Sequence, residues 1–121
     1  MRNLEEEYGR FVQVIASGDL EFARECIEKL AQSLKTISEL IDSILINMEE
    51  NGTGTSSNSK EVILKIHNAA GNAGLMSFSK VNAKLVDYEQ RFKEFGLSEE
   101  LLCEARCYFS EEHDKFLRLL K

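Results

Sequence analysis

The sequence predicts an all-α protein, an antiparallel four-helix bundle with an additional short N-terminal helix. Apolar residues recur at spacings of three and four along almost all of the 121 residues, and no segment shows the strict alternation typical of a β-strand. The chain contains no proline, so no residue type in it forces a long helix to kink. The segment from Leu20 to Glu50 has no helix breaker, and a helix of that length is typical of a bundle.

Two helices are expected in the first part of the chain. The first spans about Asn3 to Ala16, and the segment Ser17-Gly18-Asp19 ends it. Asp19 is suited to be the N-cap of the second helix, which runs from Leu20 to Glu50. The apolar faces are formed by Leu4, Tyr8, Phe11, Val12 and Ile15 in the first helix and by Phe22, Cys26, Leu30, Leu34, Ile37, Ile41, Ile44 and Met48 in the second.

A flexible loop is expected at residues 51–59, which are rich in Gly, Ser, Thr and Asn and contain no apolar residue. Neither half of the chain is expected to be stable alone, so we interpret this loop as internal to a single domain of residues 1–121. A third helix is expected to begin near Ser59 or Lys60, where Asn58 and Glu61 have the spacing of a capping box. It carries Ile63, Ile66, Ala70 and Ala73 on one face.

Two further helices complete the predicted bundle. The fourth runs from about Met76 to Phe95, with Gly96 as the residue that ends it. The fifth follows a Ser98 cap and ends near Leu120; the next two residues, Glu99 and Glu100, suit the positive end of a helix. The inward positions are Phe78, Val81, Leu85, Tyr88 and Phe92 in the fourth helix and Leu102, Ala105, Phe109, Phe116 and Leu120 in the fifth.

The charge balance and the cysteines narrow the partners and the location. The chain has 15 Lys and Arg against 21 Asp and Glu, a net charge of −6, which argues against nucleic acid or an anionic membrane as the main partner. No apolar run approaches the roughly 20 residues that cross a bilayer, and the acidic N-terminus is unlike a signal peptide. The three cysteines, Cys26, Cys103 and Cys107, therefore indicate reduced thiols and a cytoplasmic protein.

The third helix departs from its pattern around His67. Gly71 and Gly74 stand inside the helix, where each glycine costs about 0.5–1 kcal/mol relative to alanine. Ala70, Gly71 and Gly74 follow His67 by three, four and seven residues and so share its face. Two interpretations are open at this point. The bare face admits another protein close to the imidazole, or the small residues serve tight helix packing and His67 is an ordinary surface histidine.

The segment around His67 resembles the signature of histidine-containing phosphotransfer (HPt) domains, which have a His, a Gly four residues later, a second Gly after a small residue, and then an amphipathic helix. In this chain the segment reads Ile66-His67-Asn68-Ala69-Ala70-Gly71-Asn72-Ala73-Gly74-Leu75, followed by Phe78, Val81, Leu85 and Glu89. The expected order of the helices also matches that family. The resemblance therefore covers essentially the whole chain.

The resemblance implies a phosphorelay protein. His67 would accept a phosphoryl group from the phospho-aspartate of a receiver domain, or from a sensor or hybrid histidine kinase, and pass it to the receiver of a response regulator. A free imidazole has a pKa of about 6.5 and is a competent nucleophile without a separate base. By the same resemblance, Glu89 would hold the second ring nitrogen. No cofactor is implied, and the chain has no phosphate-binding glycine loop, so we expect a phosphoryl carrier without ATP-dependent kinase activity.

A receiver domain is expected to cover the His67 face, in a transient complex with a monomer of this chain. The residues expected on that face are Leu64, Asn68, Ala70, Gly71, Gly74 and Leu75. Two positions depart from the family pattern: Ala70 replaces a lysine that helps to bind phosphoryl oxygens, and Ser77 replaces a third glycine. Candidates for the missing cation are Lys60, Lys65 and Lys80.

Ala70 keeps an alternative open, a pseudo-HPt domain or helical adaptor that binds receiver domains without phosphotransfer. A third alternative, a scaffold bundle unrelated to signalling, requires a buried His67. Cys103 and Cys107 have a spacing that could chelate a metal, but a tetrahedral site needs four ligands and His113 lies about 240° around the helix from Cys107. We therefore expect no metal site, buried thiols at both cysteines and a structural role for His113.

Overall fold

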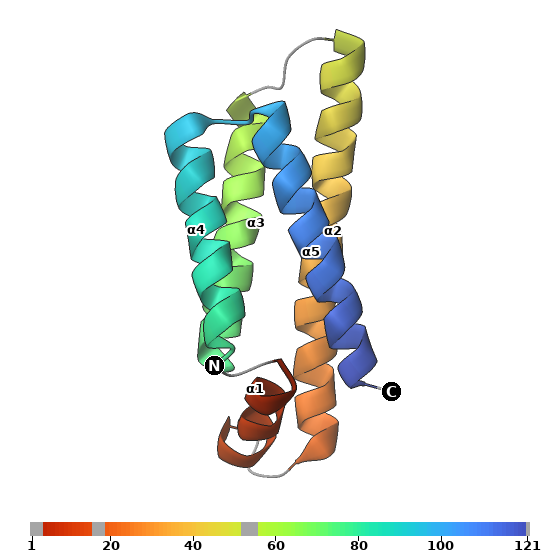
Figure 1. The fold of residues 1–121 in the computed structure, drawn as a ribbon, viewed down its shortest axis with the longest axis vertical. Coiled ribbons are helices and arrows are strands. Elements are labelled where there is room, and N and C mark those ends of the chain that lie inside the picture. The colour runs from red at the N-terminus through yellow and green to blue at the C-terminus, as the bar shows by residue number, and fades with distance from the viewer. Residues whose placement is uncertain (1–3, 16–18, 52–55, 121) are drawn as a thin grey trace.

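The computed structural model describes residues 4–15, 19–51 and 56–120, and within these ranges the chain is helical and contains no strand. The elements in order are α1 (Leu4–Arg10), a short π-helical segment η1 (Phe11–Ile15), α2 (Leu20–Asn51), α3 (Ser56–Leu75), α4 (Ser79–Phe95) and α5 (Glu99–Leu119), as Figure 1 shows. The predicted all-α class is confirmed. The expectations for Asn3, Ala16 and the Ser17-Gly18 break lie outside the described residues. None of the described helices is both long and apolar enough to cross a membrane.

The long helix α2 begins at its predicted cap. The Asp19 side chain accepts the N–H of Phe22 at 3.0 Å, and its carbonyl accepts the N–H of Ala23 at 3.0 Å. The predicted stripe is buried from Leu30 to Ile44, but Phe22 is exposed, and Ala23 takes the inward position at that end. The prediction for Phe22 is wrong because each step of four residues rotates the stripe by about 40°, and three such steps separate Phe22 from Leu34.

The helix α3 begins at Ser56, earlier than expected. The predicted capping box is wrong, since Asn58 and Glu61 both lie inside the helix. The predicted loop at residues 51–59 is too long, because residue 51 closes α2 and residues 56–59 belong to α3; residues 52–55 lie outside the described ranges. Serine and asparagine cost only about 0.5 kcal/mol inside a helix, so a helix held by a buried face extends through them. The buried positions of α3 are Val62, Ile66, Ala69, Ala70 and Ala73, and Ile63 is half-buried.

Two residues with positive φ flank α4. Ser77, in the corner between α3 and α4, has φ 62°, and α4 begins at Ser79 rather than at the expected Met76. At the other end Gly96 has φ 74° and donates its N–H to the Phe92 carbonyl at 2.9 Å, as predicted. The predicted cap of α5 is also present, because the Ser98 hydroxyl accepts the N–H of Leu101 at 3.2 Å. The five inward residues predicted for the fourth helix are buried, and the first of them, Phe78, precedes α4 as its N-cap.

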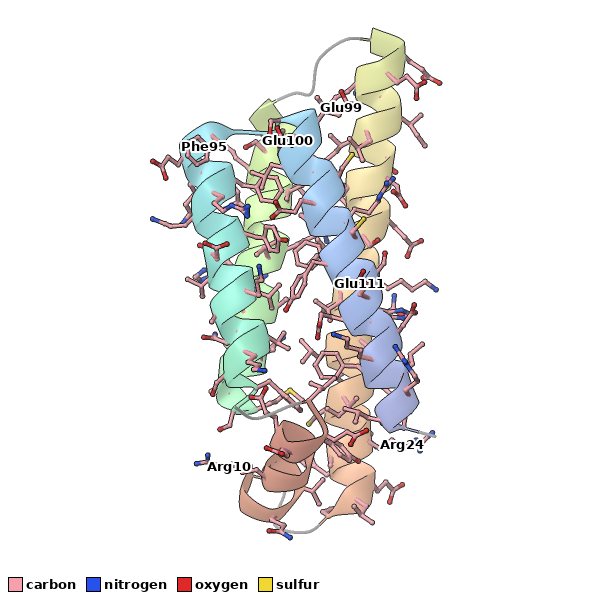
Figure 2. The ribbon with its side chains drawn as sticks, in the orientation of Figure 1. Arg10, Arg24, Phe95, Glu99, Glu100 and Glu111 are labelled. Atoms are coloured by element: carbon pink, nitrogen blue, oxygen red, sulfur yellow. The ribbon has the colours of Figure 1, made fainter. Side chains whose placement is uncertain are left out.

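The helices α2 to α5 lie side by side around a shared hydrophobic core (Figure 1). α2 packs along α5 and α3, and α3 packs along α4. Large side chains join α4 to α5 and fill the space between their ribbons (Figure 2). Tyr88 packs on Tyr108 and Phe109 with ring centroids 5.6 Å apart in each pair, and Arg91 donates to Glu104 at 2.6 and 2.7 Å. Burial and a hydrogen bond to Glu104 raise the pKa of Tyr88 to about 12.

The segments α1 and η1 lie across the end of the long helices where α3 turns into α4 (Figure 1). The ring centroid of Phe78 at that corner lies 5.8 Å from that of Phe11 in η1 and 5.3 Å from that of Phe116 in α5. The buried Glu7 carboxylate accepts the N–H of Ser79 at 2.6 Å, whereas the N-cap residue Phe78 supplies no side-chain bond. The first turn of α4 is therefore capped from the N-terminal helix.

Candidate functional site

His67 stands on the outer surface of α3 beside α4. Its side chain is 66% exposed, and its Nδ1 lies 3.2 Å from both Oε1 and Oε2 of Glu89 on α4. The sequence placed these residues 22 positions apart, and the packing of α3 along α4 brings them together. A scaffold bundle unrelated to signalling requires a buried His67, whereas this side chain is exposed.

Glu89 is held from two sides. Its side chain is 10% exposed, and Lys93, one turn further along α4, donates from Nζ to Oε2 at 2.8 Å. Burial raises the pKa of Glu89, but the hydrogen bonds and positive charges of Lys93 and His67 outweigh it, so the pKa lies below its usual value. Glu89 is therefore a carboxylate at neutral pH. The sequence interpretation missed Lys93, although its i,i+4 spacing from Glu89 was a readable signal.

The ionised state of Glu89 determines which imidazole nitrogen carries the proton. A carboxylate only accepts hydrogen bonds, so Nδ1 of His67 must donate and a neutral ring keeps its lone pair on Nε2. Nε2 lies on the side of the ring away from Glu89, and in the described part of the chain no hydrogen bond reaches it. The pair thus presents an oriented nucleophilic nitrogen to solvent.

The residues predicted to surround His67 separate into exposed and buried groups. Leu64, Asn68, Gly71, Gly74 and Leu75 are exposed, and the two leucines stand among the large apolar side chains that solvent reaches. The prediction that Ala70 shares the exposed His67 face is wrong, because this residue is 4% exposed and packs in the core with Ile66 and Ala73, as its other predicted placement requires. A step of three residues is about 60° short of a full turn, and here that rotation carries the side chain under the face instead of onto it.

The two glycines of α3 have different surroundings. A Cβ placed on Gly71 would meet nothing within 4 Å, so no contact inside the described protein requires glycine there. A Cβ on Gly74 would lie 3.1 Å from Nδ2 of Asn82 on α4. Tight helix packing therefore explains Gly74 and leaves Gly71 unexplained.

The candidate cations of the sequence analysis lie in three different places. Lys60 is exposed on α3, seven residues before His67. Lys65 lines a groove between α2 and α3 with Gln32 and Asn68. Lys80 lines a groove towards α1 and α5, away from the His67 face, with Glu7 and Tyr108 among its neighbours. The ammonium that the structure brings to Glu89 is that of Lys93.

Ser77 has the backbone conformation that favours glycine. Its φ of 62° lies in the left-handed region, which costs a residue with a side chain about 1–2 kcal/mol. Ten residues after His67, this is the position at which the sequence departs from the expected third glycine. The departure thus concerns the shape of the corner between α3 and α4.

The remaining candidates do not join the site. Cys26 and Cys103 are half-buried and Cys107 is exposed, so the predicted burial is wrong for Cys107, whose position on α5 faces solvent. His113 is partly buried and its Nδ1 lies 3.3 Å from Asp114. Within the described ranges, no three His, Cys, Asp or Glu side chains come close enough together to hold a metal ion.

Comparison with known proteins identified no relative of this chain. No protein-family model, no curated protein and no solved structure matches this chain.

Proposed function

We propose that this chain is an HPt domain, a four-helix bundle with an additional N-terminal helix, and that His67 carries the phosphoryl group. The observation that supports this most directly is the His67–Glu89 pair, in which an exposed imidazole is held through Nδ1 by a buried carboxylate at 3.2 Å. The group arrives from the phospho-aspartate of a receiver domain or from a histidine kinase and leaves to the aspartate of a response regulator. The proposed setting is the cytoplasm.

The chemical step needs no base. The lone pair of Nε2 forms a bond to phosphorus while the bond between phosphorus and the aspartyl oxygen breaks, and the aspartate leaves as a carboxylate. Nδ1 keeps its proton throughout, so the phosphorylated ring is positively charged. Glu89 accepts the Nδ1 hydrogen bond before and after transfer and stabilises that charge. The reverse step returns the phosphoryl group to a second aspartate.

Lys93 is the cation that we assign to the incoming phosphoryl oxygens in place of the lysine absent at position 70. Its side chain is about half exposed and its Nζ is held 2.8 Å from Glu89, next to the imidazole. The ammonium stands on a flexible four-carbon stem beside the carboxylate that holds the imidazole, which suits it to meet an anion bound at the ring. Ala70 is consequently weaker support for the adaptor alternative than it was from sequence.

The open space over Gly71 supports the proposed partner. An aspartyl phosphate lies within its own domain, so the donor backbone must approach the imidazole closely for an in-line transfer. Gly71 follows His67 by one turn and leaves that approach clear, at a cost of about 1 kcal/mol in helix stability. The exposed Leu64 and Leu75 border the same face and are the apolar contacts that we propose for a modest, transient interface.

Phosphoramidate, a small donor with a phosphorus–nitrogen bond, tests the proposal without a cognate partner. The full chain incubated with it should give phosphohistidine, detected by ³¹P NMR. His67→Gln should abolish the signal. His113→Gln, the matched change at the second histidine, should retain it. An unlabelled wild-type chain, or equal labelling of His67→Gln, would overturn the proposal; an unlabelled chain that still binds receiver domains would be the adaptor.

A further inference from the structure

Asn82 links α4 to α3 close to the site. Its Nδ2 donates to the backbone carbonyl of Ala70 at 2.8 Å, and its side chain is half-buried between the two helices. A carbonyl oxygen has two lone pairs, so Ala70 can accept this bond in addition to its helical one. Nothing in the sequence around Asn82 indicates a contact with α3.

The space that the Asn82 amide occupies is supplied by Gly74. A Cβ at residue 74 would lie in ordinary contact with Cγ of Asn82 at 3.7 Å but only 3.1 Å from its Nδ2, which is tighter than nine in ten Cβ contacts. The glycine lowers the stability of α3, but its missing side chain leaves room for the hydrogen bond that Asn82 makes between the two helices. This pair explains why a second glycine interrupts α3.

The bond lies near enough to the site to set its geometry. Ala70 follows His67 by three residues, about 4.5 Å along the axis, and Asn82 precedes Glu89 by seven, about 10.5 Å along α4. A hydrogen-bonded helix resists stretching over two turns. A shift of α4 by one residue against α3 would break the Asn82 bond and also displace the Glu89 carboxylate by about 1.5 Å.

We propose that Asn82 is a positioning residue for the His67–Glu89 pair. Its amide holds α4 in register with α3, and this register keeps both Glu89 oxygens 3.2 Å from Nδ1 of His67. Asn82 therefore acts on the imidazole through Glu89 and does not touch it. The consequence for phosphoryl transfer rests on the proposed function, whereas the effect on the ring is measurable without it.

The test follows the ring nitrogens of His67 by ¹⁵N NMR at neutral pH in the full chain, with His113 as the internal reference. In the wild type the proton should reside on Nδ1. Asn82→Ala should move the tautomer ratio towards that of an unpaired histidine and slow labelling by phosphoramidate by about 10-fold. Asn72→Ala, the same change at an exposed asparagine of α3, should leave both unchanged.

A second variant separates positioning from simple loss of stability. Gly74→Ala improves the helix propensity of α3 but crowds the Asn82 amide, so it should disturb the His67 tautomer while the melting temperature holds or rises. The double variant Gly74→Ala with Asn82→Ala should show no larger tautomer change than Asn82→Ala alone, since the two act through one contact.

The proposal is overturned if Asn82→Ala and Gly74→Ala both leave the His67 tautomer as Asn72→Ala does. It is also overturned if the effects of the two changes add in the double variant. One further outcome is a tautomer change in Asn82→Ala although the wild-type chain never accepts a phosphoryl group. That result would support the positioning role and contradict the proposed function. The two proposals therefore fail separately.

Discussion

The two histidines of this chain have similar partners and different surroundings. Each places Nδ1 near a carboxylate, His67 at 3.2 Å from Glu89 and His113 at 3.3 Å from Asp114. Asp114 is the next residue along the chain and its side chain is 69% exposed, whereas Glu89 comes from another helix and is 10% exposed. One turn later the chain has Gly71 after His67 and the bulky Leu117 after His113.

The two carboxylates differ in how firmly they hold the imidazole ring beside them. A solvated carboxylate on a neighbouring residue moves freely and is screened by water, so it does not hold the ring in one tautomer. The buried Glu89 carboxylate also accepts a hydrogen bond from Lys93, and this second contact fixes its position independently of the imidazole. The comparison predicts that changes around His67 alter phosphoryl transfer and that the same changes around His113 do not.

The largest effect is expected from filling the space over Gly71. Gly71→Gln should reduce transfer from a phosphorylated receiver domain by about 100-fold, because the side chain stands where the donor must approach. Labelling by the small donor phosphoramidate should change little, and the melting temperature should hold or rise because glutamine is the better helix former. The measurement uses a receiver domain that labels the wild-type chain.

Leu117→Gln, at the corresponding position after His113, is the control and should transfer like the wild type. Unchanged transfer from the receiver domain to Gly71→Gln would show that the open face of α3 is not where the donor docks.

A smaller effect is expected from the carboxylate itself. Glu89→Ala removes the group that orients Nδ1 and should slow labelling by phosphoramidate by about 10-fold. Glu89→Gln keeps an oxygen that can accept the same hydrogen bond and should recover most of the rate, which a loss of packing alone would not allow. Asp114→Ala is the matched change at His113 and should have no effect. Equal rates for Glu89→Ala and Asp114→Ala would remove the distinction between the two histidines.

The smallest effect is expected at the corner that joins the His67 helix to α4. Ser77→Gly should raise the free energy of unfolding by about 1 kcal/mol in urea titrations, because glycine adopts φ 62° without the steric cost that serine bears. His67 labelling should stay the same, since the backbone path of the corner is unchanged. A decrease in stability would indicate that the hydroxyl of Ser77 contributes more than its backbone costs.

Several local features of this fold could be predicted from the sequence because they depend on neighbouring residues. The caps at Asp19 and Ser98 and the end of α4 at Gly96 are governed by contacts within one turn, and all three are confirmed. The start of α3, and which of its two predicted faces Ala70 occupies, could not be decided in the same way. The first depends on the stability that the rest of the helix gains from packing, and the second on how far α3 is rotated about its axis.

For the candidate site, His67 and Glu89 could be named from the sequence through the resemblance. The contacts of Lys93 and Asn82 that hold the site came from the packing. The sequence by itself determined an all-helical chain with an unusual histidine on a face short of side chains, since periodicity and composition are local properties. Only the tertiary structure decided that Glu7 caps α4 and that Asn82 bonds to Ala70. It also decided that the Asn82 amide occupies the space beside Gly74, whereas the space beside Gly71 is empty. These contacts join different helices, and helix rotation and register, which no local pattern contains, decide whether they form.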